Sequence, residues 1–425
     1  MLPARRQLWL SIWCIIAAFG TYFCMYAFRR PFTVGTYRDA SGVGTDFKSL
    51  LVIAQVIGYM LSKFLSVRIV AEMSPGRRGR TILLLIVASH VALLLFAIVP
   101  APFNIICLFL NGLPLGMVFG LVLGFLEGRR STEALTAGLC ASFILADGVM
   151  KSLGAWLLAR GISEFWMPFT AGAMFLLPLF GFVAMLQRIP PPDARDVESR
   201  SERLPMSRDD RQAFLAKYGL GIGLIIAVYL LITILRSVRA DFAPEIWKGL
   251  GVNSEPALFT QSEFWVMLGV IVINGSAVLI RDNQAAFRFA LLISLGGALA
   301  IGVSLIGYHQ GMLSPFDFMV CSGLGLYVPY VAIHTTVFER LIALTRDRGN
   351  LGYLMCLADS VGYLGYVAVI LAKTFGMNRS FADLFTTMAG IVAAISAVLL
   401  LVCLLAVRWQ RREAPLASVS AAPTA

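Results

Sequence analysis

The sequence predicts an all-α polytopic membrane protein with twelve transmembrane helices in two pseudo-symmetric six-helix bundles. Three observations support this fold class. Of the 425 residues, 58% are hydrophobic and 14% are charged, whereas charged residues make up about 25% of a soluble protein. Twelve apolar segments follow one another, each long enough to cross a bilayer, which takes about 20 residues. Short motifs of the first half of the chain recur in the second half.

The twelve apolar segments form two sets of six. The first segment has no small-residue cleavage site and is too long for the apolar region of a signal peptide, so it predicts a retained helix. The predicted spans lie at 8–28, 49–70, 81–99, 103–125, 134–158 and 165–186, and then at 218–238, 260–280, 286–308, 316–338, 350–373 and 382–407.

One long hydrophilic segment inside the chain separates the two sets. It carries mixed charges and a run of three prolines, which is typical of a solvated linker. The sequence therefore predicts an N-terminal bundle over 1–187, a cytoplasmic linker over 188–217, a C-terminal bundle over 218–409 and a disordered cytoplasmic tail over 410–425.

The distribution of basic residues predicts the orientation. Twelve spans place both termini on one side, and most of the 35 Lys and Arg residues fall in the termini and the loops of that side. The positive-inside rule makes this side cytoplasmic. We expect a multi-pass protein of the cell (inner) membrane. The net charge of +11 is explained by this bias, so we expect the lipid bilayer and not nucleic acid as a partner, and a monomer.

The two halves resemble duplicated copies. The motif LADGV at 145–149 recurs as LADSV at 357–361, an offset of 212 residues, and Glu127 maps onto Glu339 with the same offset. Both matches fall in corresponding spans of the two halves. This agreement favours a duplicated six-helix unit over coincidence.

An arginine pair ends the first span of the first half. Tyr22, Tyr26 and either Arg29 or Arg30 share one side at helical spacing. That side either faces a cavity, or the arginines anchor the helix at the lipid headgroups. The duplication favours the cavity, because Arg236 stands near the end of the seventh span. Two converging guanidinium groups, one from each half, form a receptor for a dianion.

Five stretches carry a family resemblance. The chain is similar to the organophosphate/inorganic phosphate antiporters of the major facilitator superfamily, which include glycerol-3-phosphate and hexose-phosphate transporters. The resemblance implies the major facilitator fold, a substrate site between the halves, and phosphate binding by Arg29 and Arg236. The matching stretches are YAFRRPF at 26–32, GYMLSKF at 58–64, LRSVRADFAP at 235–244, LYVP at 326–329 and GYLG at 362–365.

The chain also departs from that family. The loop after the second span keeps only an acidic residue and a basic cluster of the superfamily's gating signature. Asp147 stands where the glycerol-3-phosphate antiporter has a histidine, and those antiporters lack a carboxylate like Asp359. The substrate of that family is therefore not assigned to this chain. We predict gating roles for Glu72, Arg77 and Arg78, and for Glu127 with Arg129 and Glu339 with Arg340 as salt bridges between the halves.

Charges inside predicted spans are costly and are usually paired or functional. Asp147 and Lys151, one turn apart, either form a structural ion pair or take part in transport. Asp359 has no basic neighbour one turn away on its own helix. We expect Asp359, and also Asp147, to titrate during transport or to hold a cationic group of the substrate.

Four further residues are candidates for the same cavity. Lys63 shares a face with Tyr59, and it either reaches the cavity or pairs with Asp359 or Asp147. His334 and Tyr327 lie on one polar stripe of the tenth span, at a spacing of seven residues. A pocket role is favoured over packing for His334.

Enzyme function is disfavoured. The three histidines are scattered, the seven cysteines form no Cys-x-x-Cys pair, and no phosphate-binding Gly-rich loop is present. We predict no metal, no cofactor and no catalytic residues. The sequence predicts a secondary transporter that moves a small phosphorylated or carboxylated anion by alternating access, by exchange for phosphate or coupled to protons. The alternative is a transporter-like receptor that senses a phosphorylated metabolite.

Overall fold

The computed structural model describes residues 4–38, 47–71, 73–126, 132–191, 208–253, 255–277, 279–345, 351–376 and 379–406. Within these ranges all regular structure is helical. Twelve helices in this part of the chain are long and apolar enough to cross a membrane. The prediction of an all-α, multi-pass membrane protein is therefore confirmed.

The first six spans form the N-terminal bundle, and α1 continues into two short 3₁₀ helices. The elements are α1 (Ala4–Met25), η1 (Tyr26–Phe28), η2 (Pro31–Val34), α2 (Phe47–Ala71), α3 (Pro75–Ile98), α4 (Ile105–Leu126), α5 (Thr132–Ala159) and α6 (Met167–Gln187).

The second six spans form the C-terminal bundle. Its tenth span is built from α12, a π-helical turn η4 and α13 in succession. The elements are α8 (Arg208–Asp241), α9 (Ala243–Gly249), α10 (Pro256–Ala277), α11 (Asn283–His309), α12 (Pro315–Ala332), η4 (Ile333–Val337), α13 (Phe338–Thr345), α14 (Leu351–Gly376) and α15 (Phe381–Ala406).

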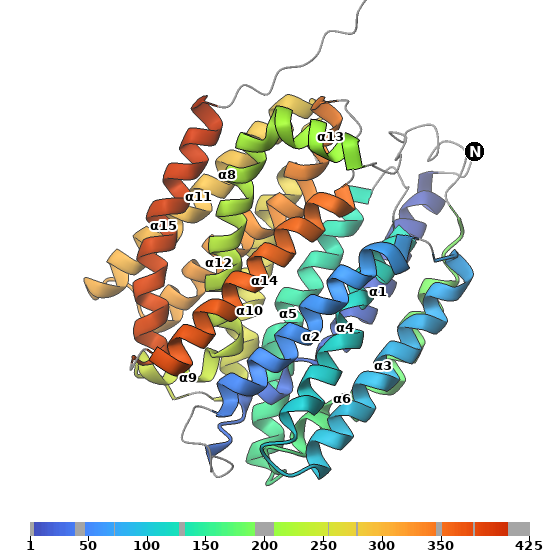
Figure 1. The fold of residues 1–425 in the computed structure, drawn as a ribbon, viewed down its shortest axis with the longest axis vertical. Helices are drawn as coiled ribbons and strands as arrows, with labels where there is room; N and C mark the ends of the chain where they lie inside the picture. Colours follow the sequence, from blue (N-terminus) through green and yellow to red (C-terminus); the bar gives the residue numbers. More distant parts are fainter. Residues whose placement is uncertain are drawn as a thin grey trace, which may run out of the picture.

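The two bundles lie side by side (Figure 1). The start of α1 and the end of α15 lie on the same side of the molecule, at the top of Figure 1, which we call the terminal face. Helix α9 lies at the other end, which we call the opposite face. Within the N-terminal bundle α2 and α4 approach closely at Gly112, which has no side chain. A Cβ at this position would lie 2.1 Å from the backbone oxygen of Gln55.

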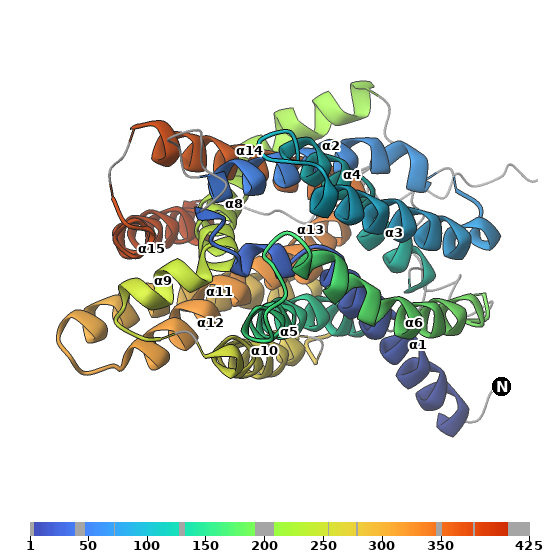
Figure 2. The ribbon, with the colours of Figure 1, turned by 90° about the horizontal axis from the view of Figure 1, so that it is seen from below.

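The bundles meet through two helix pairs, α5 with α10 and α2 with α14, which lie side by side when the molecule is viewed from the opposite face (Figure 2). Near the end of α5, Oγ of Ser152 lies 2.6 Å from Oγ1 of Thr260 near the start of α10. Lys48, at the start of α2, pairs with Glu245 of α9 at 2.5 Å. These contacts hold the two bundles together at the opposite face.

Two helix starts differ most from the sequence-based expectation. Helix α8 begins at Arg208, so residues 208–217 are helical instead of belonging to the linker; they contain no Gly or Pro, and early acidic residues favour a helix start. Helix α3 begins at Pro75, a residue suited to the first helical position. Arg77 and Arg78 therefore lie in its first turns and not in a loop.

The first spans of the two bundles end differently. Helix α1 stops at Met25, and the backbone N–H groups of Arg29 and Arg30 both donate to the oxygen of Tyr26, at 3.0 and 2.9 Å. Pro31 follows, and proline has no backbone N–H to donate and disfavours the α conformation of the residue before it. Helix α8, in contrast, is continuous through Arg236. Arg29 is thus placed by a 3₁₀ turn, whereas Arg236 is placed by an α-helix.

Candidate functional site

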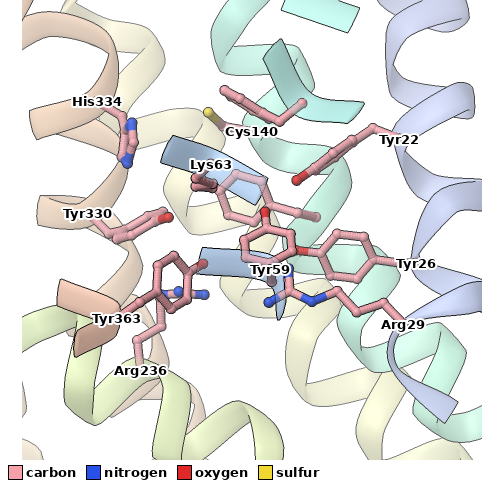
Figure 3. A pocket seen from close by; sticks show the side chains of 12 residues that line it. Tyr22, Tyr26, Arg29, Tyr59, Lys63, Cys140, Arg236, Tyr330, His334 and Tyr363 are labelled. Carbon is pink, nitrogen blue, oxygen red and sulfur yellow. The ribbon is translucent and has the colours of Figure 1, made fainter. Parts of the chain in front are cut away.

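A pocket lies between the two bundles (Figure 3). It contains about 380 Å³ of space between the atoms, part of it open to solvent. Its walls are aromatic and basic, with side chains from both bundles. The lining residues are Tyr22, Tyr26, Arg29, Tyr59, Lys63, Phe119, Cys140, Phe143, Arg236, Tyr330, His334 and Tyr363.

Arg29 enters the pocket from the N-terminal bundle. Its guanidinium carbon lies 3.8 Å from the centre of the Tyr59 ring, so the cation stacks on an aromatic face. Its backbone oxygen accepts a hydrogen bond from Gln55 at 3.2 Å, and Gln55 in turn donates to Asn111 at 2.7 Å. Buried amide side chains therefore hold the backbone that carries Arg29.

Arg236 enters from the C-terminal bundle in a similar way. Its guanidinium carbon lies 4.3 Å from the centre of the Tyr330 ring and 5.8 Å from that of Tyr327. Arg29 and Arg236 are each only 4% exposed. Among the described residues no carboxylate forms an ion pair with either one, and the Nε atom of each has no hydrogen-bond partner. Two buried cations therefore face one pocket without a counter-charge from the part of the chain that the structure describes.

Lys63 lines the same pocket, but its charge is compensated. It pairs with Asp359 across the interface between α2 and α14. The phenol of Tyr229 donates to the same carboxylate, and Nε2 of His334 lies 3.3 Å from it. Of the alternatives left open by the sequence, Lys63 therefore both reaches the pocket and pairs with Asp359. This carboxylate offsets the repulsion between Lys63 and the two pocket arginines.

A second charged cluster lies outside the lining of the pocket. Asp147 pairs with Lys151 one turn away and with Nε of Arg30 at 2.7 Å. Arg30 also bonds Asp241 of the other bundle, which accepts a 2.7 Å hydrogen bond from Tyr366. The ion pair of Asp147 and Lys151, one of the two alternatives left open by the sequence, is present. Arg30, to which the sequence assigned no role, connects the bundles.

The structure brings together seven of the eight predicted substrate-binding residues as pocket lining. The eighth, Tyr327, lies behind them with its ring 6.3 Å from that of Phe143. Sequence reasoning missed five lining residues. Two had a signal, since Tyr330 is four residues before His334 and Tyr363 is four residues after Asp359. Phe119, Cys140 and Phe143 had none, because they are apolar residues in apolar helices.

The predicted gating residues are distributed differently. Glu72, Glu127 and Arg129 lie outside the described residues. Arg78 donates to the backbone oxygen of Gly124 in its own bundle, and Arg340 donates to Asn283 of its own bundle at 2.6 Å. The gating roles, including those of Arg77 and Glu339, stay predictions.

Known proteins support the fold. A crystal structure of a D-xylose-proton symporter matches with a TM-score of 0.65 over 92% of this chain and 96% of that chain, at 13% sequence identity. At this identity the likeness shows the fold, and it confirms the major facilitator architecture expected from the sequence. No curated protein matches the sequence. A family model described as "Family of unknown function (DUF5690)" matches residues 31–410, and the chain therefore belongs to that family.

Proposed function

We propose that this protein is a secondary active transporter that carries a small phosphorylated or carboxylated anion by alternating access. One observation carries the proposal: Arg29 and Arg236 come from different bundles, line one pocket, and have no ion-pair partner among the described residues. Leaving two cations buried without counter-charge is costly. A dianionic solute supplies the missing charge.

The stacking geometry favours recognition of oxygen anions. A guanidinium that lies against a tyrosine ring keeps its N–H edges available for bidentate hydrogen bonds to phosphate or carboxylate oxygens. Because the two arginines belong to different bundles, an anion that binds both favours the arrangement in which the bundles approach. Binding is thereby coupled to the relative position of the bundles. The similarity to organophosphate antiporters agrees with this chemistry.

Asp359 is the candidate for coupling to protons. It accepts hydrogen bonds from Lys63 and Tyr229 and lies beside His334, so protonation of this carboxylate would weaken the Lys63 pair between the bundles. The alternative energy source is exchange for phosphate, which needs no titrating group. Replacing Asp359 by Asn separates the two: proton-driven uptake is lost, whereas phosphate exchange persists.

Counterflow in proteoliposomes tests the proposal. Vesicles loaded with inorganic phosphate are expected to take up labelled phosphate or labelled glycerol 3-phosphate. Arg29→Gln and Arg236→Gln should each weaken binding by roughly 10- to 150-fold, since a hydrogen bond to a charged group contributes about 1.5–3 kcal/mol. Arg188→Gln, which removes an exposed cation after α6, is the matched control.

The outcomes separate transport from sensing. Exchange that depends on both arginines supports a transporter. Binding without exchange identifies a receptor of the same anion. If both arginine variants bind and exchange like the control, the anion-carrying proposal is wrong.

A further inference from the structure

His334 occupies a special position in the tenth span. It lies in the π-helical turn η4, and such turns occur frequently at functional sites. Its side chain lines the pocket and is 6% exposed. Figure 3 shows His334 and Arg236 on either side of the Tyr330 side chain. The histidine therefore lies away from the arginine that is expected to hold the anionic end of the solute.

One nitrogen of the imidazole is fully engaged. Nε2 lies 2.5 Å from the phenol oxygen of Tyr229 and 3.3 Å from Oδ1 of Asp359. The single phenol proton of Tyr229 is donated to Asp359. The phenol oxygen must then accept its other hydrogen bond from Nε2–H of His334, because a phenol has only one proton. Tyr229 and Asp359 thus place the proton of a neutral His334 on Nε2.

The other nitrogen, Nδ1, lacks a hydrogen-bond partner in the described part of the chain. Nδ1 of His334 is buried without a hydrogen bond to any described residue. With the proton on Nε2, Nδ1 carries a lone pair and is an acceptor. The rings of Tyr330 and Tyr229 pack beside the imidazole, with their centres 4.9 and 5.1 Å from its centre. A solute in the pocket is then the available source of a donor.

We infer that Nδ1 of His334 accepts a hydrogen bond from a hydroxyl group of the solute, so that the preferred solute is a hydroxylated organic anion and not inorganic phosphate. The inference rests on the proposed function, because Arg29 and Arg236 hold the anionic end. Arg236 and His334 both lie against Tyr330, at 4.3 and 4.9 Å from its ring centre. An ester with a short hydroxylated carbon chain spans this one-ring separation.

A pair of probes isolates the hydroxyl group. Glycerol 3-phosphate and n-propyl phosphate share the phosphate and the three-carbon chain, but only the first has free hydroxyls. We expect the purified wild-type protein to bind glycerol 3-phosphate about 10-fold or more tightly, because the analogue leaves a buried acceptor unpaired. Glycerate and propionate form the corresponding pair for a carboxylated solute.

Two substitutions at position 334 distinguish the role of Nδ1 from that of Nε2. His334→Gln places an amide near the position of Nε2 and lacks an acceptor at Nδ1, so the preference for glycerol 3-phosphate over n-propyl phosphate should fall to about 1- to 2-fold. His334→Asn places an amide oxygen near Nδ1 and should keep part of the preference. Tyr229→Phe removes the group that sets the tautomer and should also reduce the preference.

The results are distinguishable. Equal binding of both members of a pair by the wild type, or an undiminished preference in His334→Gln, overturns this inference and leaves the anion site intact. If no phosphorylated or carboxylated probe binds the wild type, the proposed function fails and the inference fails with it.

Discussion

Arg30 of the N-terminal bundle donates a hydrogen bond to the carboxylate of Asp241 in the C-terminal bundle. Both side chains are almost inaccessible to solvent, with 4% and 6% of their surface exposed. The same guanidinium contacts Asp147 at 2.7 Å. One cation therefore compensates carboxylates of both bundles next to Arg29, the pocket arginine.

We expect the Arg30–Asp241 pair to stabilise the arrangement of the bundles seen here. Arg30→Gln and Asp241→Asn should each lower stability by about 3–5 kcal/mol, because each leaves an uncompensated buried charge. The double variant should lose less than the sum of the two, since Asp147 keeps Lys151 as partner. Denaturation of the detergent-purified variants in a double-mutant cycle measures the coupling. Strictly additive effects would show that the pair is not coupled.

Closure at the opposite face can be tested by cross-linking. Ser152 of α5 and Thr260 of α10 have side-chain oxygens 2.6 Å apart, so cysteines at these positions should form a disulfide on oxidation. If transport requires the bundles to separate at this face, the oxidised double variant should exchange solute at least about 10-fold more slowly, and reduction should restore the rate. The single cysteine variants are controls. Full exchange by the cross-linked protein would contradict alternating access.

Lys63 and Asp359 should affect anion affinity in opposite directions. Lys63→Gln removes a positive charge from the pocket wall, whereas Asp359→Asn removes the negative charge that compensates it. We expect phosphate binding to weaken by about 10-fold in the first and to strengthen by about 10-fold in the second, from the Coulomb energy of a unit charge at roughly 10 Å and an effective dielectric constant of about 20. Titration calorimetry measures both.

The double variant Lys63→Gln/Asp359→Asn is the matched control, because it leaves the net charge of the pocket unchanged. Its phosphate affinity should stay near that of the wild type. A change of the same sign in both single variants would mean that packing and not charge controls the affinity.

Tyr37 links the segment after η2 to the α5–α6 connection. Its backbone N–H donates to Glu164 at 2.6 Å and its phenol donates to the oxygen of Phe32 at 3.0 Å. Burial, and next the charge of Glu164, raise the pKa of Tyr37 well above its ordinary value. An unfolded tyrosine ionises near pH 10. The contribution of the protonated Tyr37 side chain to folding stability is therefore complete below that pH and is lost as pH rises toward the pKa of Tyr37 in the folded state.

Replacing Tyr37 by Phe tests this dependence. At pH 7 to 9 the variant should be less stable by about 1 kcal/mol, the usual contribution of one hydrogen bond. Above about pH 10 the difference should shrink, because only the wild type loses stability by ionisation of this side chain. Thermal unfolding across this pH range gives the comparison. Parallel curves would exclude an ionisation of Tyr37 linked to unfolding.

The sequence alone determined the number and kind of spans, because a segment that crosses a bilayer must satisfy its own backbone hydrogen bonds and be apolar over its length. These are local properties. The sequence also identified Arg29, Arg236 and Asp359 as candidates, because charged side chains within apolar segments are easily recognised and energetically costly. Exact helix limits were less accessible, as α8 shows, because a polar helical extension has no apolar periodicity to mark it.

Only the tertiary structure decided which charges are paired. Lys63 meets Asp359 across 296 positions of the chain, and Arg30 meets Asp241 across 211. No spacing rule connects residues so far apart, because their contact depends on which helix faces pack together at the interface of the bundles. That packing gives the charges of Lys63 and Arg30 carboxylate partners, whereas Arg29 and Arg236 face the pocket. This difference between the cations is the reason to propose an anionic solute.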